Sequence, residues 1–169
     1  MPASERISFA VIRFVHETMY GLFKDPVKPL EAAGLSAGQQ ALEVGCGPGH
    51  FTLPAARIVG KDGSLTAIDV NPHAVDQVAA KLRESAVTNA TVRLVDATAT
   101  DFDDGSFDLV FVFGLPRVER GGFEALWPEL HRVLRADGTL AVEGRTPPPA
   151  RLFREEWSRD KVTRYRRLS

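Results

Sequence analysis

The chain has 169 residues, of which 44% are hydrophobic and 25% are charged, a composition typical of one globular domain with a continuous core. The formal net charge of −1 provides no general attraction to nucleic acid, so no specific nucleic-acid partner is expected. No apolar run approaches the roughly 20 residues of a membrane span, and the first residues lack the layout of a signal peptide, so we expect a cytoplasmic protein.

The first 36 residues are expected to form an N-terminal helical arm or lid. Apolar residues recur at near-helical intervals over residues 6–23, and prolines then interrupt the pattern. A short second helix is expected over residues 30–33, closed by Gly34. The arm either lies over a bound ligand or only covers the edge of the main fold. Docking of its apolar face on a membrane is a weaker alternative.

After this arm, segments with strand character alternate with helical segments. Strands are expected over residues 40–44, 64–69, 91–95, 107–113 and 139–143, and helices over residues 52–59, 72–86 and 123–134. This alternation predicts an α/β fold: a Rossmann-like, doubly wound, mainly parallel sheet of five or more strands with helices on both faces. Residues 37–146 are expected to form this core.

The most informative segment joins the first strand to the next helix and contains three glycines. It reads Glu43-Val-Gly-Cys-Gly-Pro-Gly49, so Gly45, Gly47 and Gly49 are spaced two apart. Glycine suits a tight turn that a ligand approaches closely, because it adopts positive φ and has no Cβ. The spacing differs from the GxGxxG of pyrophosphate-binding loops, and Glu43 would repel a diphosphate but attract an ammonium or sulfonium group. The loop therefore predicts a cationic adenosyl ligand.

With this loop the chain resembles the class I S-adenosylmethionine-dependent methyltransferases, whose first motif is an acid-x-Gly-x-Gly-x-Gly loop. The resemblance extends over roughly residues 30–144. The segment Leu130–Leu140 is similar to the helix-turn-strand of small-molecule members, including the ubiquinone and menaquinone C-methyltransferases, where its role is structural. The resemblance implies S-adenosylmethionine as the cofactor. In this family the segment before the first motif often lies over the cofactor, sometimes with a tyrosine, and if the arm is such a lid Tyr20 is expected to contact the cofactor.

Acidic residues end or follow successive strands, at the edge where ligands bind in a doubly wound sheet. Asp69 ends the second strand and can accept hydrogen bonds from both ribose hydroxyls. Asp96 follows the third strand and can accept from the exocyclic amine of adenine, while the Ala97 amide donates to a ring nitrogen. Glu43 is expected to orient the loop and to attract the amino group of the methionine moiety.

The expected cofactor-binding set has further members. Val70 follows Asp69, and Cys46, the single cysteine, is expected to be a small, partly buried filler in the glycine loop. Phe113 ends the fourth strand, where it either contacts the cofactor or belongs to the core. His131 is expected to be a surface or edge histidine. The full set is Glu43, Gly45, Cys46, Gly47, Gly49, Asp69, Val70, Asp96, Ala97, Phe113 and Tyr20.

Two features depart from the family pattern. Many relatives place acidic or histidine residues near the acceptor after the fourth strand, whereas this chain reads Phe113-Gly-Leu-Pro-Arg-Val-Glu119. The second feature is a short, basic C-terminal segment, residues 147–169. Residues 152–159 are expected to form a helix and residues 162–168 at most one strand, so the C-terminal strands of the sheet are expected to be reduced or missing. A missing sheet edge favours a homodimer.

The leading hypothesis is a methyltransferase that moves a methyl group from S-adenosylmethionine to a small or lipid-like acceptor by in-line displacement. This reaction requires alignment and exclusion of water rather than a dedicated nucleophile or metal. No metal site and no catalytic residue are assigned, because nothing favours His16, Arg117 or Glu119 over the others. One alternative is a non-catalytic adenosyl-cofactor-binding or interaction module. Another is an NAD-dependent oxidoreductase, which fits Asp69 on a ribose but not the glycine spacing.

Overall fold

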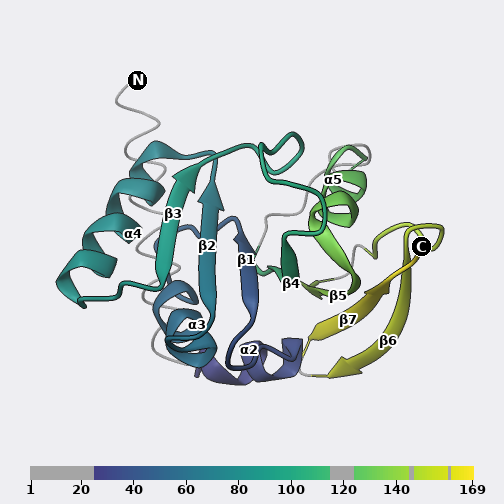
Figure 1. Cartoon of the computed structure of the whole chain (residues 1–169), viewed down its shortest axis with the longest axis horizontal. Coiled ribbons are helices and arrows are strands. Elements are labelled where there is room, and N and C mark those ends of the chain that lie inside the picture. The colour runs from purple at the N-terminus through teal and green to yellow at the C-terminus, as the bar shows by residue number, and fades with distance from the viewer. Residues whose placement is uncertain (1–24, 115–123, 145–146, 160) are drawn as a thin grey trace.

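The computed structural model describes residues 25–114, 124–144, 147–159 and 161–169, which form a seven-stranded sheet with helices on both faces (Figure 1). The strand order is β3-β2-β1-β4-β5-β7-β6. The strands are β1 (Gln40–Val44), β2 (Ser64–Asp69), β3 (Ala90–Leu94), β4 (Phe107–Val112), β5 (Leu134–Glu143), β6 (Phe153–Arg159) and β7 (Val162–Arg167), and the helices are α2 (Val27–Ala33), α3 (Thr52–Val59), α4 (Pro72–Glu84) and α5 (Leu126–Val133). The predicted first helix, over residues 6–23, lies outside the described residues.

The first five strands are parallel, and β1 lies between β2 and β4. The chain runs outwards from β1 through β2 to β3, and then returns to β4 on the other side of β1. In sheets of this kind, ligands bind outside the carboxyl ends of the strands, where the strand order reverses. The predicted doubly wound, mainly parallel sheet is confirmed, and the reversal between β1 and β4 locates the edge where a site is expected.

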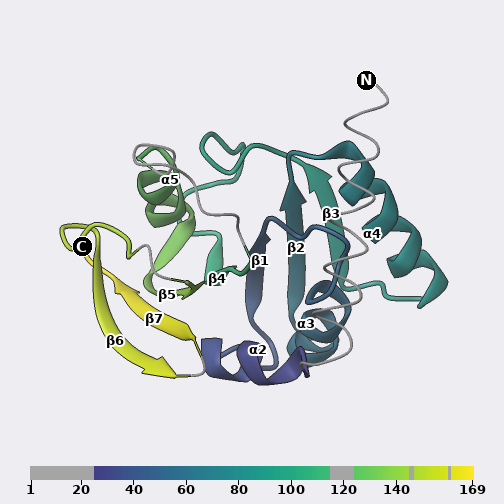
Figure 2. The same cartoon turned by 180° about the vertical axis from the view of Figure 1, so that it is seen from behind.

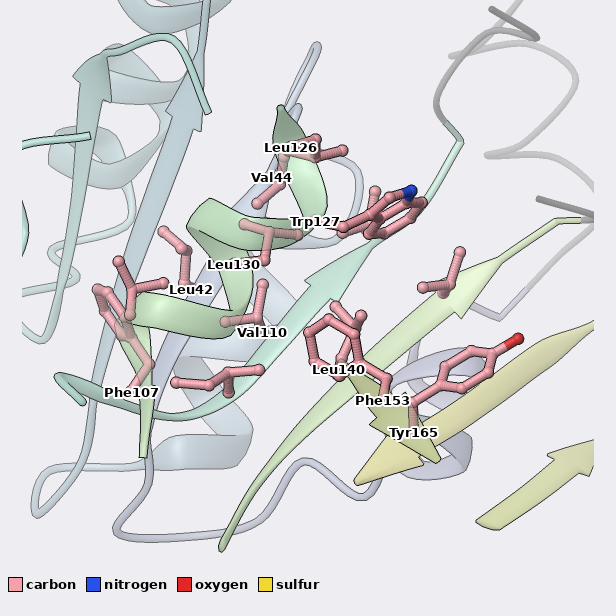
Figure 3. Close-up of a cluster of buried hydrophobic side chains, with 14 of the residues drawn as sticks. Leu42, Val44, Phe107, Val110, Leu126, Trp127, Leu130, Leu140, Phe153 and Tyr165 are labelled. Carbon is pink, nitrogen blue, oxygen red and sulfur yellow. The ribbon is translucent and has the colours of Figure 1, made fainter. Parts of the chain in front are cut away.

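Two hydrophobic clusters cover the two faces of the sheet, because successive residues of a strand point to opposite sides. On one face, α5 packs on a cluster that includes Leu42, Val110 and Leu140 (Figure 3). On the other face, α2 and α3 pack on a cluster that includes Ala41 and Leu109. Each fully buried side chain of the size of leucine contributes about 1.5–3 kcal/mol. The burial of both faces explains why β1 and β4 are nearly continuous apolar runs.

Local signals set the ends of two helices. The Asn71 side chain accepts a hydrogen bond from the His73 N–H at 2.9 Å, and Pro72 occupies the first turn of α4. Gly34, at φ +84°, ends α2 in the left-handed conformation that glycine adopts most readily. The predicted start of α4 and the predicted end of α2 are confirmed.

The strand β5 is longer than predicted, because it begins at Leu134. Leu134 pairs with Phe107 and Thr139 pairs with Leu109, so residues 135–138 form a bulge in the ladder. A Cβ at Gly138 would lie 2.9 Å from the backbone oxygen of Arg135, which cannot move aside easily, so this bulge favours glycine. The turn of the expected helix-turn-strand segment Leu130–Leu140 is thus a bulge inside one strand.

The C-terminal strands are both present, so the prediction that they are reduced or missing is wrong. β7 pairs antiparallel with β5, and β6 pairs antiparallel with β7. Both views place this hairpin at the opposite end of the molecule from β3 and α4 (Figures 1 and 2). The helix expected over residues 152–159 is instead β6. Its polar side chains suit an exposed edge strand, while Phe153 and Tyr165 anchor the hairpin in the core (Figure 3).

Candidate functional site

The glycine loop leaves the carboxyl end of β1 and leads into α3. Its three glycines all have positive φ: +75° at Gly45, +49° at Gly47 and +83° at Gly49. A Cβ at Gly49 would lie 2.9 Å from Val78 Cγ2, whereas a Cβ at Gly47 would meet no atom within 4 Å. Gly49 therefore allows α4 to pack closely against the loop, and Gly47 leaves the backbone of the loop accessible.

Hydrogen bonds tie this loop to the end of β2. The N–H groups of Gly45 and Cys46 both donate to the Ile68 carbonyl, at 2.9 and 3.1 Å. The Gly47 N–H donates to Asp69 Oδ2 at 2.8 Å, and the Asn71 N–H donates to Asp69 Oδ1 at 2.9 Å. The carboxylate of Asp69 thus fixes both the glycine loop and the start of the next connection.

Glu43 is the next-to-last residue of β1 and comes two residues before Gly45. Its side chain is only 3% exposed, and the Thr52 hydroxyl donates to its Oε2 at 2.7 Å. Burial raises the pKa of Glu43 to about 8; the Thr52 hydrogen bond opposes this rise, and the negative charge of Asp69 adds to it. Near neutral pH the carboxyl group is therefore mainly protonated in the free protein, and a nearby cation would favour its ionised form. Thr52 was not among the residues predicted from the sequence.

Cys46 is buried in this loop, at 4% exposure. Burial is the main cause that raises the pKa of its thiol, and the charges of Glu43 and Asp69 raise it further. The thiolate is therefore scarce near neutral pH, and Cys46 packs as a small apolar residue with Ala67, Val78 and neighbouring side chains.

Three further residues of the predicted cofactor-binding set, Val70, Asp96 and Ala97, follow the ends of β2 and β3. The Val95 N–H donates to the Asp69 carbonyl at 3.1 Å, which brings Asp96 to the same edge as Asp69. Asp96 is exposed, and its Oδ1 accepts from the Thr98 N–H and hydroxyl; these hydrogen bonds lower its pKa. Ala97 is partly buried against the α5 cluster. Val70 is 69% exposed, an unusual position for a large apolar side chain.

Phe113 belongs to the core in this structure. It is 5% exposed and packs edge-on against Phe51 with ring centroids 5.2 Å apart. The ring of Phe111 lies at the same centroid separation but is tilted relative to Phe113. Of the two roles left open for Phe113, the contacts correspond to the core role. Tyr20, His16, Arg117 and Glu119 lie outside the described residues.

The connection from β3 to β4 is held by a network that sequence reasoning missed. Glu129 Oε1 accepts from the Thr100 N–H at 2.9 Å and from the Thr100 hydroxyl at 2.6 Å. Arg132 donates to both oxygens of Glu129, to Asp104 and to the Phe102 carbonyl. Hydrogen bonds from Arg132 and then from Thr100 outweigh desolvation and lower the pKa of Glu129 to about 2. The i,i+3 spacing of Glu129 and Arg132 is visible in the sequence, but their partners 28 to 30 residues earlier are not.

His131 contacts the C-terminal part of the chain. Its Nε2 forms a 2.7 Å hydrogen bond with the Leu168 carbonyl, and its ring packs edge-on against Phe153. The imidazole therefore links α5 to the C-terminal hairpin, in agreement with its predicted non-catalytic place.

The site thus combines a glycine loop with acids at the carboxyl ends of three adjacent strands. A family model described as a methyltransferase domain matches residues 41–138 of this chain. The chain belongs to this family. The match spans the loop, the three acids and α5, and it does not support the alternative of an NAD-dependent oxidoreductase.

Individual relatives agree with this family. Nocamycin O-methyltransferase of Saccharothrix syringae is 35% identical over 120 residues, which cover 67% of this chain and 40% of that protein. Demethylmenaquinone methyltransferase of Staphylococcus aureus (strain MRSA252) is 29% identical over 126 residues, 74% of this chain and 51% of that protein. The chain therefore spans about half the length, or less, of these curated relatives.

A solved structure shows the same fold. The crystal structure of a SAM-dependent methyltransferase from Aquifex aeolicus superposes on this chain with a TM-score of 0.68 at 23% sequence identity. The superposition covers 85% of this chain and 90% of that chain. Together, these findings confirm the predicted methyltransferase family and the Rossmann-like fold expected for it.

Proposed function

We propose that this chain transfers the methyl group of S-adenosylmethionine to a small or lipid-like acceptor at the carboxyl edge of β1, β2 and β4. The single observation that supports this most is the hydrogen bond from Gly47 to Asp69, which holds an open glycine loop beside a carboxylate at the point where the strand order reverses.

The residues at this edge fit an adenosyl cofactor. Asp69 uses each oxygen once, and a carboxylate oxygen has two acceptor sites, so Asp69 retains capacity for two ribose hydroxyls. The exposed side chain of Val70 offers an apolar surface for adenine, and Asp96 and Ala97 offer its polar edge an acceptor and a donor. Gly45, Gly47 and Gly49 permit the close approach of the methionine part, with Glu43 and Cys46 below them.

The cofactor supplies an activated methyl group when it is bound, so this chain has to position the acceptor and exclude water. Alignment of this kind can lower a barrier by about 7–11 kcal/mol. The aromatic side chains of Phe51 and Phe113 lie on the α3 side of this edge and keep it apolar. Under this proposal Glu43 is ionised by the nearby positive charge and stabilises it in return.

The small-molecule acceptor is suggested by the relatives named nocamycin O-methyltransferase and demethylmenaquinone methyltransferase. The alternative is a cofactor-binding module without turnover, which the same glycine loop and carboxylate would also permit. Incubation with S-adenosylmethionine labelled in its methyl group and with fractionated cell extract separates the two. Labelled product supports the methyltransferase, and cofactor binding without any labelled product supports the module.

Two further predictions, a homodimer and a cytoplasmic location, extend this proposal. A homodimer was predicted because the sheet edge was expected to be missing, but β6 and β7 form that edge. β6 is nevertheless an exposed edge strand on which a second copy can pair. We also retain the proposal of a cytoplasmic location. Within the described ranges, no helix is both long and apolar enough to cross a membrane.

A further inference from the structure

We propose that Glu143 binds the methyl acceptor by accepting a hydrogen bond, so that the acceptor bears a hydroxyl or amine group on an apolar body. This inference rests on the proposed function, because it assumes that an acceptor binds at the carboxyl edge of the sheet. It adds the chemical class of the acceptor and one residue that recognises it.

Glu143 is the last residue of β5, at the edge where the site lies. Val142 pairs with Val112 of β4, and Val112 pairs with Val44 of β1, so Glu143 is level with Phe113 and Gly45. Neighbouring strands are about 4.8 Å apart, which places the Glu143 backbone about 10 Å from the start of the glycine loop. This separation leaves room for a small acceptor between Glu143 and a cofactor on the loop.

The side chain of Glu143 points to the same face of the sheet as the aromatic residues of the site. Ala141 packs in the cluster that contains Phe111 and Phe113, and Glu143 follows Ala141 by two residues on the same strand. The strand is also held firmly here, because Glu143 pairs with Val162 and the Gly144 N–H donates to the Lys161 carbonyl.

One oxygen of this carboxylate, Oε2, is buried and has no hydrogen-bond partner within the described part of the chain. A buried acceptor without a donor costs free energy, and native proteins rarely leave one. Among Phe113, Gly114, Glu143 and Gly144, the described residues that end β4 and β5, only Glu143 has a polar side chain. A donor on the bound acceptor would satisfy this oxygen, whereas an acceptor bearing a carboxylate would be repelled.

The test compares Glu143→Gln and Glu143→Leu with Glu155→Gln, a matched change on the exposed strand β6. The first measurement is denaturant unfolding without ligand. Both Glu143 variants are expected to unfold at the same denaturant concentration as wild type or at a higher one, because the carboxylate that they replace has a buried oxygen without a hydrogen-bond donor. A lower midpoint for both variants would show that Glu143 stabilises the fold, and would overturn the proposal.

The second measurement is equilibrium dialysis of three probes, 2-naphthol, tetrahydroisoquinoline and 2-naphthoate, in the presence of S-adenosylhomocysteine. Wild type and Glu155→Gln are expected to bind at least one of the two donor probes about tenfold more tightly than 2-naphthoate. Glu143→Leu is expected to lose this preference, and Glu143→Gln to retain part of it for 2-naphthol. Wild type that binds neither donor probe, that binds all three equally, or whose preference survives in Glu143→Leu would overturn the proposal.

Binding of S-adenosylhomocysteine itself separates this inference from the function on which it rests. All four proteins are expected to bind it within about twofold of one another, because Glu143 is not in the proposed cofactor site. If none of them binds it, the proposed function fails. If all bind it and the probe preference is absent, only the role of Glu143 fails.

Discussion

Gly47 donates its backbone N–H to the carboxylate of Asp69 at 2.8 Å, and this hydrogen bond joins the loop after β1 to the end of β2. The same carboxylate accepts the Asn71 N–H through its other oxygen. The conformation of the glycine loop and the proposed ribose contact therefore depend on one side chain. A change at Asp69 is expected to disturb both.

Gly47 is expected to serve ligand binding as well as the backbone turn, and Gly38 is its matched control. Gly47 and Gly38 both have positive φ, and a Cβ at either would meet no atom within 4 Å. Gly47→Ala and Gly38→Ala are each expected to lower the free energy of unfolding by about 1–2 kcal/mol. Only Gly47→Ala is expected to weaken binding of S-adenosylhomocysteine, by about tenfold or more in calorimetric titration. Equal loss of binding in the two variants would mean that Gly47 acts through stability alone.

The buried carboxyl group of Glu43 is expected to make the free protein less stable as pH rises. The folded protein retains the Glu43 proton up to a pKa of about 8, whereas the unfolded chain loses it near the ordinary value of 4.5. Between these two values the folded state binds more protons, so the free energy of unfolding falls by at most about 1.4 kcal/mol per pH unit. Glu43→Gln keeps a partner for Thr52 and removes this dependence.

Denaturant unfolding of wild type and Glu43→Gln between pH 5 and pH 8 measures this effect. The variant is expected to gain stability relative to wild type as pH increases. Glu31→Gln, an exposed change in α2, is the control and is expected to follow wild type. A difference between Glu43→Gln and wild type that does not change with pH would contradict the raised pKa.

The Glu129–Arg132 network is expected to support cofactor binding from a distance. Glu129→Gln weakens the hydrogen bonds to Arg132 and Thr100 that hold the connection after β3, where Asp96 and Ala97 lie. Because Arg132 is partly exposed, the loss in free energy of unfolding is expected to be only about 1 kcal/mol. Binding of S-adenosylhomocysteine is expected to weaken several-fold. The exposed Glu124→Gln serves as the control, and indistinguishable binding by the two variants would show that the network has no part in the site.

The centre of the fold could be predicted from the sequence because two local signals agree there. The apolar runs of β1, β2 and β4 require burial on both faces, and the turns between them are marked by glycine, asparagine and proline. The glycine loop could be located for the same reason. Its hydrogen bonds to Ile68 and Asp69, 22 or more residues away, join the carboxyl ends of two strands that were both predicted.

Of the two C-terminal strands, β7 lies where a strand was expected, over residues 162–168, but β6 could not be predicted, because it has no apolar alternation. β6 exposes six of its seven residues, and only its pairing with β7 makes it a strand. The same reason applies to the β3–β4 connection, since no local pattern shows that Thr100 will bond to Glu129. The raised pKa of Glu43 was also missed, because burial and not residue type causes it.

Calorimetric titration of S-adenosylhomocysteine into wild type, Asp69→Asn and Asp62→Asn tests the central claim most directly. Asp62 is an exposed aspartate that pairs only with Lys61 in the described structure, so it serves as the matched control. Wild type and Asp62→Asn are expected to bind in the micromolar range, and Asp69→Asn at least about tenfold more weakly. Undiminished binding by Asp69→Asn, or no binding by wild type, would contradict a cofactor site built on Gly47 and Asp69.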